Sequence, residues 1–296
     1  VFNLMKNVSE SLDGRVAVLD LQGLSQSEKE KRPETSPFIP SLKLRRDVRP
    51  MDLPAIYSVI FRGSFPRLVS EDKINWKLFY GSYVRTYIER DVRQILNLTQ
   101  EIAFMKFVKV LAARTGQLLN YSELARDVDV SVNTAKNWLS VLEASGLVFL
   151  VRPYSNNLTS KAVKTPKVYF YDTGLVAYLT GYESPEALSS GIINGAILET
   201  YVVSEIVKSY IHNGEPASVY FYRDTNNREI DLIVEKGNIL YPIEIKRTAS
   251  PSKNDARHFG VLEKTRMDVG LGAVVCLVDS PVSLGPDIVA MPVAYL

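Results

Sequence analysis

The pattern of hydrophobic and polar residues changes along this chain of 296 residues. From about residue 50 to residue 117, apolar positions recur every three or four residues, which is the period of an α-helix. Residues 72–96 show this period with charged residues in between, and the stripe consists of Trp76, Phe79, Tyr80, Tyr83, Val84, Tyr87 and Ile88. Because a helix buries one such face, we expect these side chains to form core rather than a ligand site. Residues 41–117 are therefore predicted to be a helical, lid-like connector.

Two short helices and a strand are predicted next. Residues 121–128 form an amphipathic segment, and Ser131 is a good N-cap for a second helix over residues 132–144. Gly146 is expected just after that helix, where a positive φ is favoured, and an apolar strand follows at once. This succession predicts a winged helix-turn-helix with its wing, which we assign to residues 118–180.

The segments on either side of this unit have less distinct patterns. Residues 26–40 are rich in Ser, Glu, Lys and Pro, which predicts an exposed linker. Residues 168–180 predict a strand that runs into a helix capped by Asp172 or Thr173. We assign no chemistry to that segment.

The last part of the chain, residues 181–296, has a regular order of elements. A helix, three strands, a helix and two more strands are predicted over residues 192–212, 218–223, 228–235, 239–247, 252–266, 271–279 and 288–294. The order αβββαβ resembles the core of the restriction-endonuclease-like fold. We therefore expect a multidomain α+β or α/β chain with this core at its end.

A hairpin predicted in this part brings charged residues together. Gly237-Asn238 fits a two-residue turn, and the resulting register puts Asp231 opposite Glu244. Residues that face each other in this way lie about 5 Å apart at Cβ, and Lys246 points to the same side as Glu244. The alternate apolar residues are expected on the other face, in a core: Ile230, Leu232, Val234, Ile243 and Ile245.

Glu199 on the long helix supplies a fourth charged group. Its neighbours at helical spacing are mostly apolar, so it borders the face expected to meet the sheet, whereas Glu205 is expected at the surface. Hard divalent cations prefer carboxylate oxygens, so the candidate ligands of Mg²⁺ or Mn²⁺ are Glu199, Asp231 and Glu244. With Lys246 these are the candidate catalytic residues for phosphodiester hydrolysis, in which a metal polarises the phosphoryl group. The alternative is an ion-paired cluster without a metal.

Charge is distributed unevenly, although the net charge is only +2. Residues 152–167 carry four basic and no acidic side chains, whereas residues 168–296 carry 16 acidic and 10 basic ones. DNA affinity would therefore come from the basic strip and from the second helix of the helix-turn-helix. The candidate DNA-binding residues are Asn133, Lys136, Asn137, Arg152, Lys161, Lys164 and Lys167. Alternatively, the winged helix docks a protein.

These motifs resemble known families. Gly195-x-x-x-Glu199, Glu229-Ile230-Asp231 and Glu244-Ile245-Lys246 resemble the PD-(D/E)XK nuclease superfamily. Nearly the whole chain resembles prokaryotic AAA-type ATPases that end in an uncharacterised domain of that kind, on the evidence of residues 6–15, 154–158 and 169–175. The resemblance implies that residues 1–40 are a residual ATPase segment and linker, and that the phosphate-binding half lies upstream.

Nucleotide chemistry is not expected from this chain alone. It has no G-x-x-x-x-G-K-[ST] loop, so ATP would bind only through the upstream ATPase core, which could also form an oligomer. His212 and His258 lack the spacing of a zinc motif and are expected at the surface. A single cysteine in an apolar run, no signal peptide and no long apolar segment predict a cytoplasmic protein without a membrane partner.

Two hypotheses for function follow. The first is a fragment of an AAA-type ATPase with a DNA-binding winged helix and a metal-dependent nuclease domain. The second is that the nuclease-like domain is non-catalytic and docks a protein or a nucleic acid for the ATPase.

Overall fold

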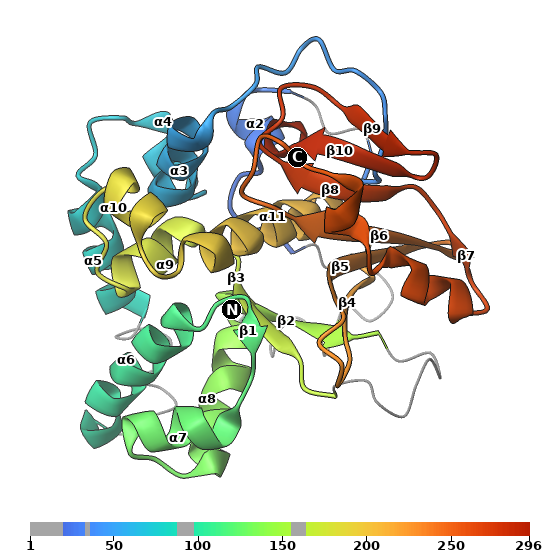
Figure 1. Ribbon diagram of the computed structural model, residues 1–296. Helices are drawn as coiled ribbons and strands as arrows, with labels where there is room; N and C mark the ends of the chain where they lie inside the picture. Colours follow the sequence, from blue (N-terminus) through green and yellow to red (C-terminus); the bar gives the residue numbers. More distant parts are fainter. Residues whose placement is uncertain (1–19, 33–35, 88–97, 155–163) are drawn as a thin grey trace, which may run out of the picture.

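A mixed sheet runs through most of the chain. The computed structural model describes residues 20–32, 36–87, 98–154 and 164–296, which form a mixed α+β structure (Figure 1). Within these residues ten strands join in the order β1-β3-β2-β4-β5-β6-β8-β10-β9, and β7 pairs with β6. Helices gather at one side of the molecule, and α11 leads from them to the sheet (Figure 1).

The segment predicted to be a helical connector consists mainly of helices in the described residues. It comprises α3 (Leu53–Arg62), α4 (Pro66–Ser70), α5 (Trp76–Tyr87) and α6 (Leu98–Ala113). Tyr80 and Tyr87 of the predicted stripe are buried, and its half-buried members pack against the same core: Trp76, Phe79, Tyr83 and Val84. Trp76 stacks on Phe61 with ring centroids 4.2 Å apart, and Ile88 lies outside the described residues.

The helix-turn-helix elements also lie where they were predicted. They are α7 (Tyr121–Val128) and α8 (Val132–Ala144), followed by β2 (Val148–Pro153). The Ser131 side chain accepts the N–H of Thr134 at 3.0 Å, and Gly146 has φ 71°. β3 (Lys167–Phe170) pairs antiparallel with β2 and with β1 (Gln117–Leu118).

The segment after β3 begins with a capped helix. Asp172 is the N-cap of α9 (Thr173–Leu179) and accepts the N–H of Leu175 at 2.6 Å. A short helix, α10 (Pro185–Ser190), leads on to α11 (Asn194–Ile211).

The C-terminal part keeps the predicted order, with two corrections. The elements are α11, β4 (Val219–Arg223), β5 (Glu229–Lys236), β6 (Ile239–Ile245), β8 (Gly272–Cys276) and β10 (Ile288–Pro292). The helix expected over residues 252–266 is instead two 3₁₀ turns, η2 (Lys253–Ala256) and η3 (Phe259–Lys264). Two short strands were not expected, β7 (Asp268–Val269) and β9 (Val282–Gly285).

The sheet is continuous across the predicted domain boundary at residues 180 and 181. Strand β2 pairs in parallel with β4, so that Arg152 lies beside Tyr220 and Pro153 beside Phe221. The hairpin that follows the helix-turn-helix is therefore hydrogen-bonded to the C-terminal strands. This places β3 next to α11, which it contacts.

The two faces of the C-terminal strands bury different cores. Leu232, Val234, Ile243 and Ile245 share the larger core with the apolar residues of α11. The opposite face carries a smaller core, in which Ile233 and Leu240 meet Phe259 and Leu262 of η3. Because residues of a strand alternate between faces, this assignment fixes where each charged side chain points.

A β-bulge in β5 changes that assignment at Asp231. Tyr220 pairs with Ile233 but Tyr222 pairs with Ile230, so two residues of β5, Asp231 and Leu232, lie opposite Phe221 alone. Ile230 consequently belongs to the smaller core rather than, as predicted, to the core of Leu232 and Val234. Asp231 lies at the bulge, where its charge acts on Glu199 of α11 and on Glu244 of β6.

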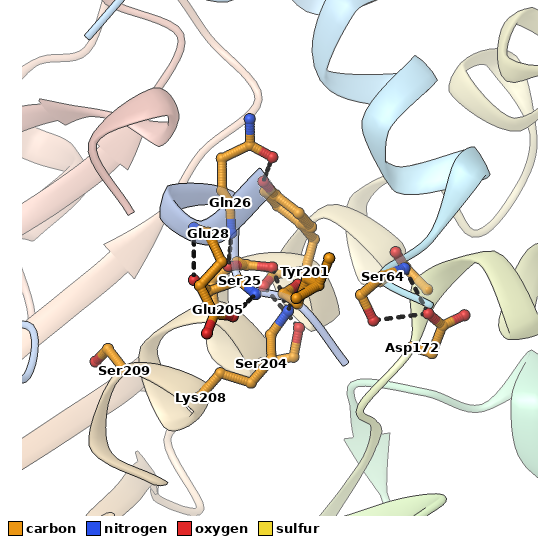
Figure 2. A network of polar contacts seen from close by, with 12 residues as sticks. Ser25, Gln26, Glu28, Ser64, Asp172, Tyr201, Ser204, Glu205, Lys208 and Ser209 are labelled. Atoms are coloured by element: carbon orange, nitrogen blue, oxygen red, sulfur yellow. Dashed lines mark hydrogen bonds and ion pairs between the residues drawn. The ribbon is translucent and has the colours of Figure 1, made fainter. Parts of the chain in front are cut away.

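The segment predicted as an exposed linker is also partly buried. It begins with a short helix, α2 (Gln26–Lys29), capped by the Ser25 side chain. Ser25, Gln26 and Ser27 are buried against α11. The segment is buried because the ion pair Glu205–Lys208 of α11 binds its backbone (Figure 2).

Candidate functional site

A buried lysine lies at the centre of the acidic residues that the sequence singles out. Lys167 Nζ lies 3.0 Å from Glu199 Oε1 on α11 and 2.7 Å from Glu229 Oε1 on β5. Its side chain is only 4% exposed. Tyr169, two residues further along β3, donates its hydroxyl to Glu199 Oε1 at 2.6 Å. We name these residues, together with Asp231, the Lys167 cluster.

Asp231 lies where β5 and β6 separate. Its Oδ2 accepts the backbone N–H of Ile245 at 2.8 Å, in place of a strand-to-strand bond. Burial raises the pKa of the Asp231 carboxyl, and the positive charges of Lys167 and Lys246 oppose that rise.

A second ion pair lies on the other face of β6. Glu244 stands between Ile243 and Ile245, which face α11, so its own side chain points away from α11. Lys246 Nζ lies 2.6 Å from Glu244 Oε1. The sequence predicts Asp231, Glu244 and Lys246 on one face. Although the bulge interrupts the alternation of β5 at this point, the charge of Asp231 raises the pKa of Glu244, and Lys246 opposes the rise in the pKa of Asp231, so the three groups remain neighbours.

The electrostatics of the site favour protonation of two carboxyls. Burial raises the pKa of Glu199 to about 7, and Lys167 opposes this while Asp231 adds to it. Burial, followed by the charge of Asp231, raises the pKa of Glu244 to about 8. Buried carboxylates that are close to one another thus compete for two ammonium groups, and protons compensate part of the excess negative charge.

The residues present do not fit the expected Mg²⁺ or Mn²⁺. In the part of the chain that the structure describes, no three Asp, Glu, His or Cys side chains converge to hold a metal ion. Glu199 is bonded to Lys167 and Tyr169, Asp231 to the backbone of Ile245, and Glu244 to Lys246. Of the predicted ligands, Glu199 and Glu244 are thus ion-paired with lysines, and Asp231 accepts a backbone N–H.

The predicted DNA-binding residues are separated by their exposure. Asn133, Lys136 and Asn137 are exposed on the first turns of α8, and the ammonium of Lys136 lies over the ring of Tyr121 at 5.5 Å. Arg152 on β2 and Lys164, just before β3, are also exposed. Lys161 lies outside the described residues. Lys167 is a correction, because a buried ion-paired ammonium does not reach a phosphate.

Three members of the Lys167 cluster were not among the predicted catalytic or metal-binding residues: Lys167, Tyr169 and Glu229. Lys167 and Tyr169 are two residues apart on a strand, which puts both on one face, and this spacing was the available signal. Glu229 also stands two residues before Asp231. His258, expected at the surface, is half-buried, and its Nδ1 lies 3.3 Å from the backbone nitrogen of Glu229.

Glu205 is a further correction away from this site. Its carboxylate is buried, accepts the N–H of Gln26 at 2.7 Å and pairs with Lys208 Nζ at 2.5 Å (Figure 2). Lys208 also donates to the carbonyl of Leu24 at 3.0 Å. Glu205 and its neighbour Lys208 therefore do not face solvent. They bind the backbone of the segment at Leu24 and Gln26.

Two domains of unknown function match the chain. Residues 54–186 match DUF8612, and residues 194–296 match DUF4143. The uncharacterised proteins Mb2031c of Mycobacterium bovis and Rv2008c of Mycobacterium tuberculosis are each 31% identical over 250 residues, which are 84% of this chain and 51% of either relative. The chain thus spans about half the length of the curated relatives it matches. No solved structure matches it.

Within the ranges that the structure describes, every helix is too short or too polar to cross a membrane.

Proposed function

We propose that this chain is a DNA-docking, non-catalytic part of an AAA-ATPase-associated protein, with a winged helix-turn-helix and a restriction-endonuclease-like domain. The observation that carries the non-catalytic assignment is the pairing of Lys167 with both Glu199 and Glu229. The Lys167 ammonium occupies the space between these two carboxylates, where a divalent cation would have to bind their oxygens.

The parent protein is inferred from the C-terminal domain. DUF4143 is usually found in AAA-ATPase-associated proteins, and residues 194–296 match it. The order of α11, β4, β5, β6, β8 and β10 supports the restriction-endonuclease-like assignment. ATP binding, oligomer formation and cytoplasmic location stay predictions about the whole protein.

The DNA-docking role rests on the exposed start of α8. In helix-turn-helix proteins the second helix enters the major groove with its N-terminal residues. Asn133, Lys136 and Asn137 occupy those positions and are exposed. The exposed Arg152 and Lys164 add positive charge in the adjoining hairpin, where phosphate contacts are expected.

The test is the salt dependence of binding to a fluorescently labelled DNA duplex. Each phosphate contact contributes about 0.9 to the slope of log affinity against log salt. The double variant Lys136→Ala/Lys164→Ala should lower the slope by up to about 1.8, whereas Lys264→Ala, which removes an exposed lysine from η3, should leave it unchanged.

Two results would contradict the proposal. A slope that the double variant does not change would favour the competing hypothesis, in which the helix-turn-helix docks a protein. Cleavage of the duplex in the presence of Mg²⁺ or Mn²⁺, abolished by Lys246→Ala, would show that the domain is a nuclease.

A further inference from the structure

We infer that Lys167 is the resident cation of the acidic cluster, a tethered ammonium that occupies the space between Glu199 and Glu229 and excludes a divalent metal. The inference rests on the proposed non-catalytic function and explains how the chain itself prevents metal binding. It assigns a role to a side chain that comes from β3 of the helix-turn-helix unit, outside the C-terminal domain.

The contacts of Lys167 are those of a bound cation. Its Nζ reaches one carboxylate oxygen of Glu199 at 3.0 Å and one of Glu229 at 2.7 Å. The ammonium also lies 5.4 Å from the centroid of the Phe221 ring, whose face attracts positive charge. Tyr169 donates to the same oxygen of Glu199, so the cluster supplies that oxygen with two donors.

The backbone of Lys167 is held on both sides. In β3 it pairs with Leu118 of β1 and with Val151 of β2. Strand β2 is itself paired with β4, next to the strand that carries Glu229 and Asp231. The position of the ammonium is therefore fixed by a continuous sheet rather than by a flexible surface side chain.

Removal of the ammonium would leave acidic groups facing α11 without their cation. Glu199 and Glu229 would lose their shared partner, and Glu229 would keep only the more distant Arg223, at 3.6 Å, among its ion pairs in the described residues. Oxygens of Glu199 and Glu229 both reach the position of the ammonium, and a hard divalent cation prefers such carboxylate oxygens. Lys167→Met should therefore create the metal affinity that the wild-type chain lacks.

The affinity for Mn²⁺ is measured directly, by the electron paramagnetic resonance signal of free Mn²⁺ and by calorimetry. The wild-type chain should show no saturable site, and Lys167→Met should bind one Mn²⁺ at least about tenfold more tightly, which corresponds to about 1.4 kcal/mol. Lys167→Met/Glu199→Gln should lose this gain, and Lys264→Met, which removes an exposed lysine from η3, should show no more Mn²⁺ binding than the wild type.

The inference is overturned if folded Lys167→Met gains no affinity for Mn²⁺. It is also overturned if the wild-type chain binds one Mn²⁺ at a site that Glu199→Gln removes, a measurement that does not require Lys167→Met to fold. DNA binding is measured without metal, so a failure of DNA docking does not affect this result. Conversely, a chain that binds DNA while Lys167→Met gains no Mn²⁺ affinity contradicts only this inference.

Discussion

The carboxylate of Asp172 accepts two hydrogen bonds from Ser64, which is 108 residues earlier in the chain (Figure 2). Asp172 Oδ2 lies 2.6 Å from the Ser64 backbone nitrogen and 2.7 Å from its Oγ. The other oxygen accepts the Tyr80 hydroxyl at 2.7 Å and the N–H of Leu175 at 2.6 Å. One buried side chain thus caps α9 and ties it to α5 and to the segment that follows α3.

Asp172→Ala should therefore destabilise the fold strongly. It removes the acceptor of four hydrogen bonds, and buried donors left without a partner cost about 1–3 kcal/mol each. We expect a loss of about 3–5 kcal/mol in the free energy of unfolding, measured by urea denaturation. Asp287→Ala, at an exposed turn, is the control and should change stability little. Equal stability of the two variants would contradict this role.

Gly174 should tolerate no side chain, because α9 approaches the end of α3 there. A Cβ at Gly174 would lie 2.8 Å from Gly63 Cα and 2.9 Å from the carbonyl oxygen of Arg62, and it would also meet the Tyr80 hydroxyl. Gly174→Ala should cost about 1–3 kcal/mol of stability, as overpacking of a dense interior does.

Gly195 of α11 is the matched control for that substitution. A Cβ built there has no neighbour within 4 Å, so Gly195→Ala should leave stability unchanged or raise it by up to about 1 kcal/mol. The glycine of the motif Gly195-x-x-x-Glu199 therefore has no steric role in this structure. Thermal unfolding that ranks Gly195→Ala below Gly174→Ala would contradict both predictions.

The buried pair Glu205–Lys208 should be coupled in energy. Lys208→Met leaves a buried carboxylate without its cation, and breaking such a pair typically costs about 3–5 kcal/mol. The double variant Glu205→Leu/Lys208→Met should cost less than the sum of the two single variants, by about 1–3 kcal/mol. A double-mutant cycle in urea denaturation measures this coupling, and additive costs would show that the two charges act independently.

The sequence predicted most elements because their signals are local. The helical period of the connector, the Ser131 cap and the Gly237-Asn238 turn each depend on a few adjacent residues, and Lys236 indeed pairs with Ile239. The register of the hairpin was correct from that turn as far as Leu232 and Ile243. It did not extend to Asp231, because the bulge arises from the pairing of β5 with β4.

The composition of the site could not be predicted in the same way. Lys167 belongs to a basic strip, and only the pairing of β2 with β4 brings it to Glu199 and Glu229. Glu205 has polar neighbours on its own helix, and only the return of the segment at Gln26 buries it. In both cases long-range strand and segment contacts decided the environment of a charged residue.

Stability should fall as pH rises from about 5 to 8, because two carboxyls hold their protons in the folded state. The pKa is about 7 for Glu199 and about 8 for Glu244, against an ordinary value of 4.5 that we take for the unfolded chain. Between these values the folded state binds more protons than the unfolded state, so the free energy of unfolding decreases with pH. Below pH 4.5 both states are protonated, and this contribution is fully present.

Thermal unfolding at constant ionic strength over this pH range tests the linkage. The wild-type melting temperature should decrease toward pH 8, and Glu199→Gln/Glu244→Gln should flatten the decrease because glutamine does not titrate. Glu263→Gln, at an exposed position of η3, should keep the wild-type dependence. The raised pKa of Lys167 acts only above this range, since its ordinary value is already 10.5. A double variant with the wild-type slope would place the titration elsewhere in the molecule.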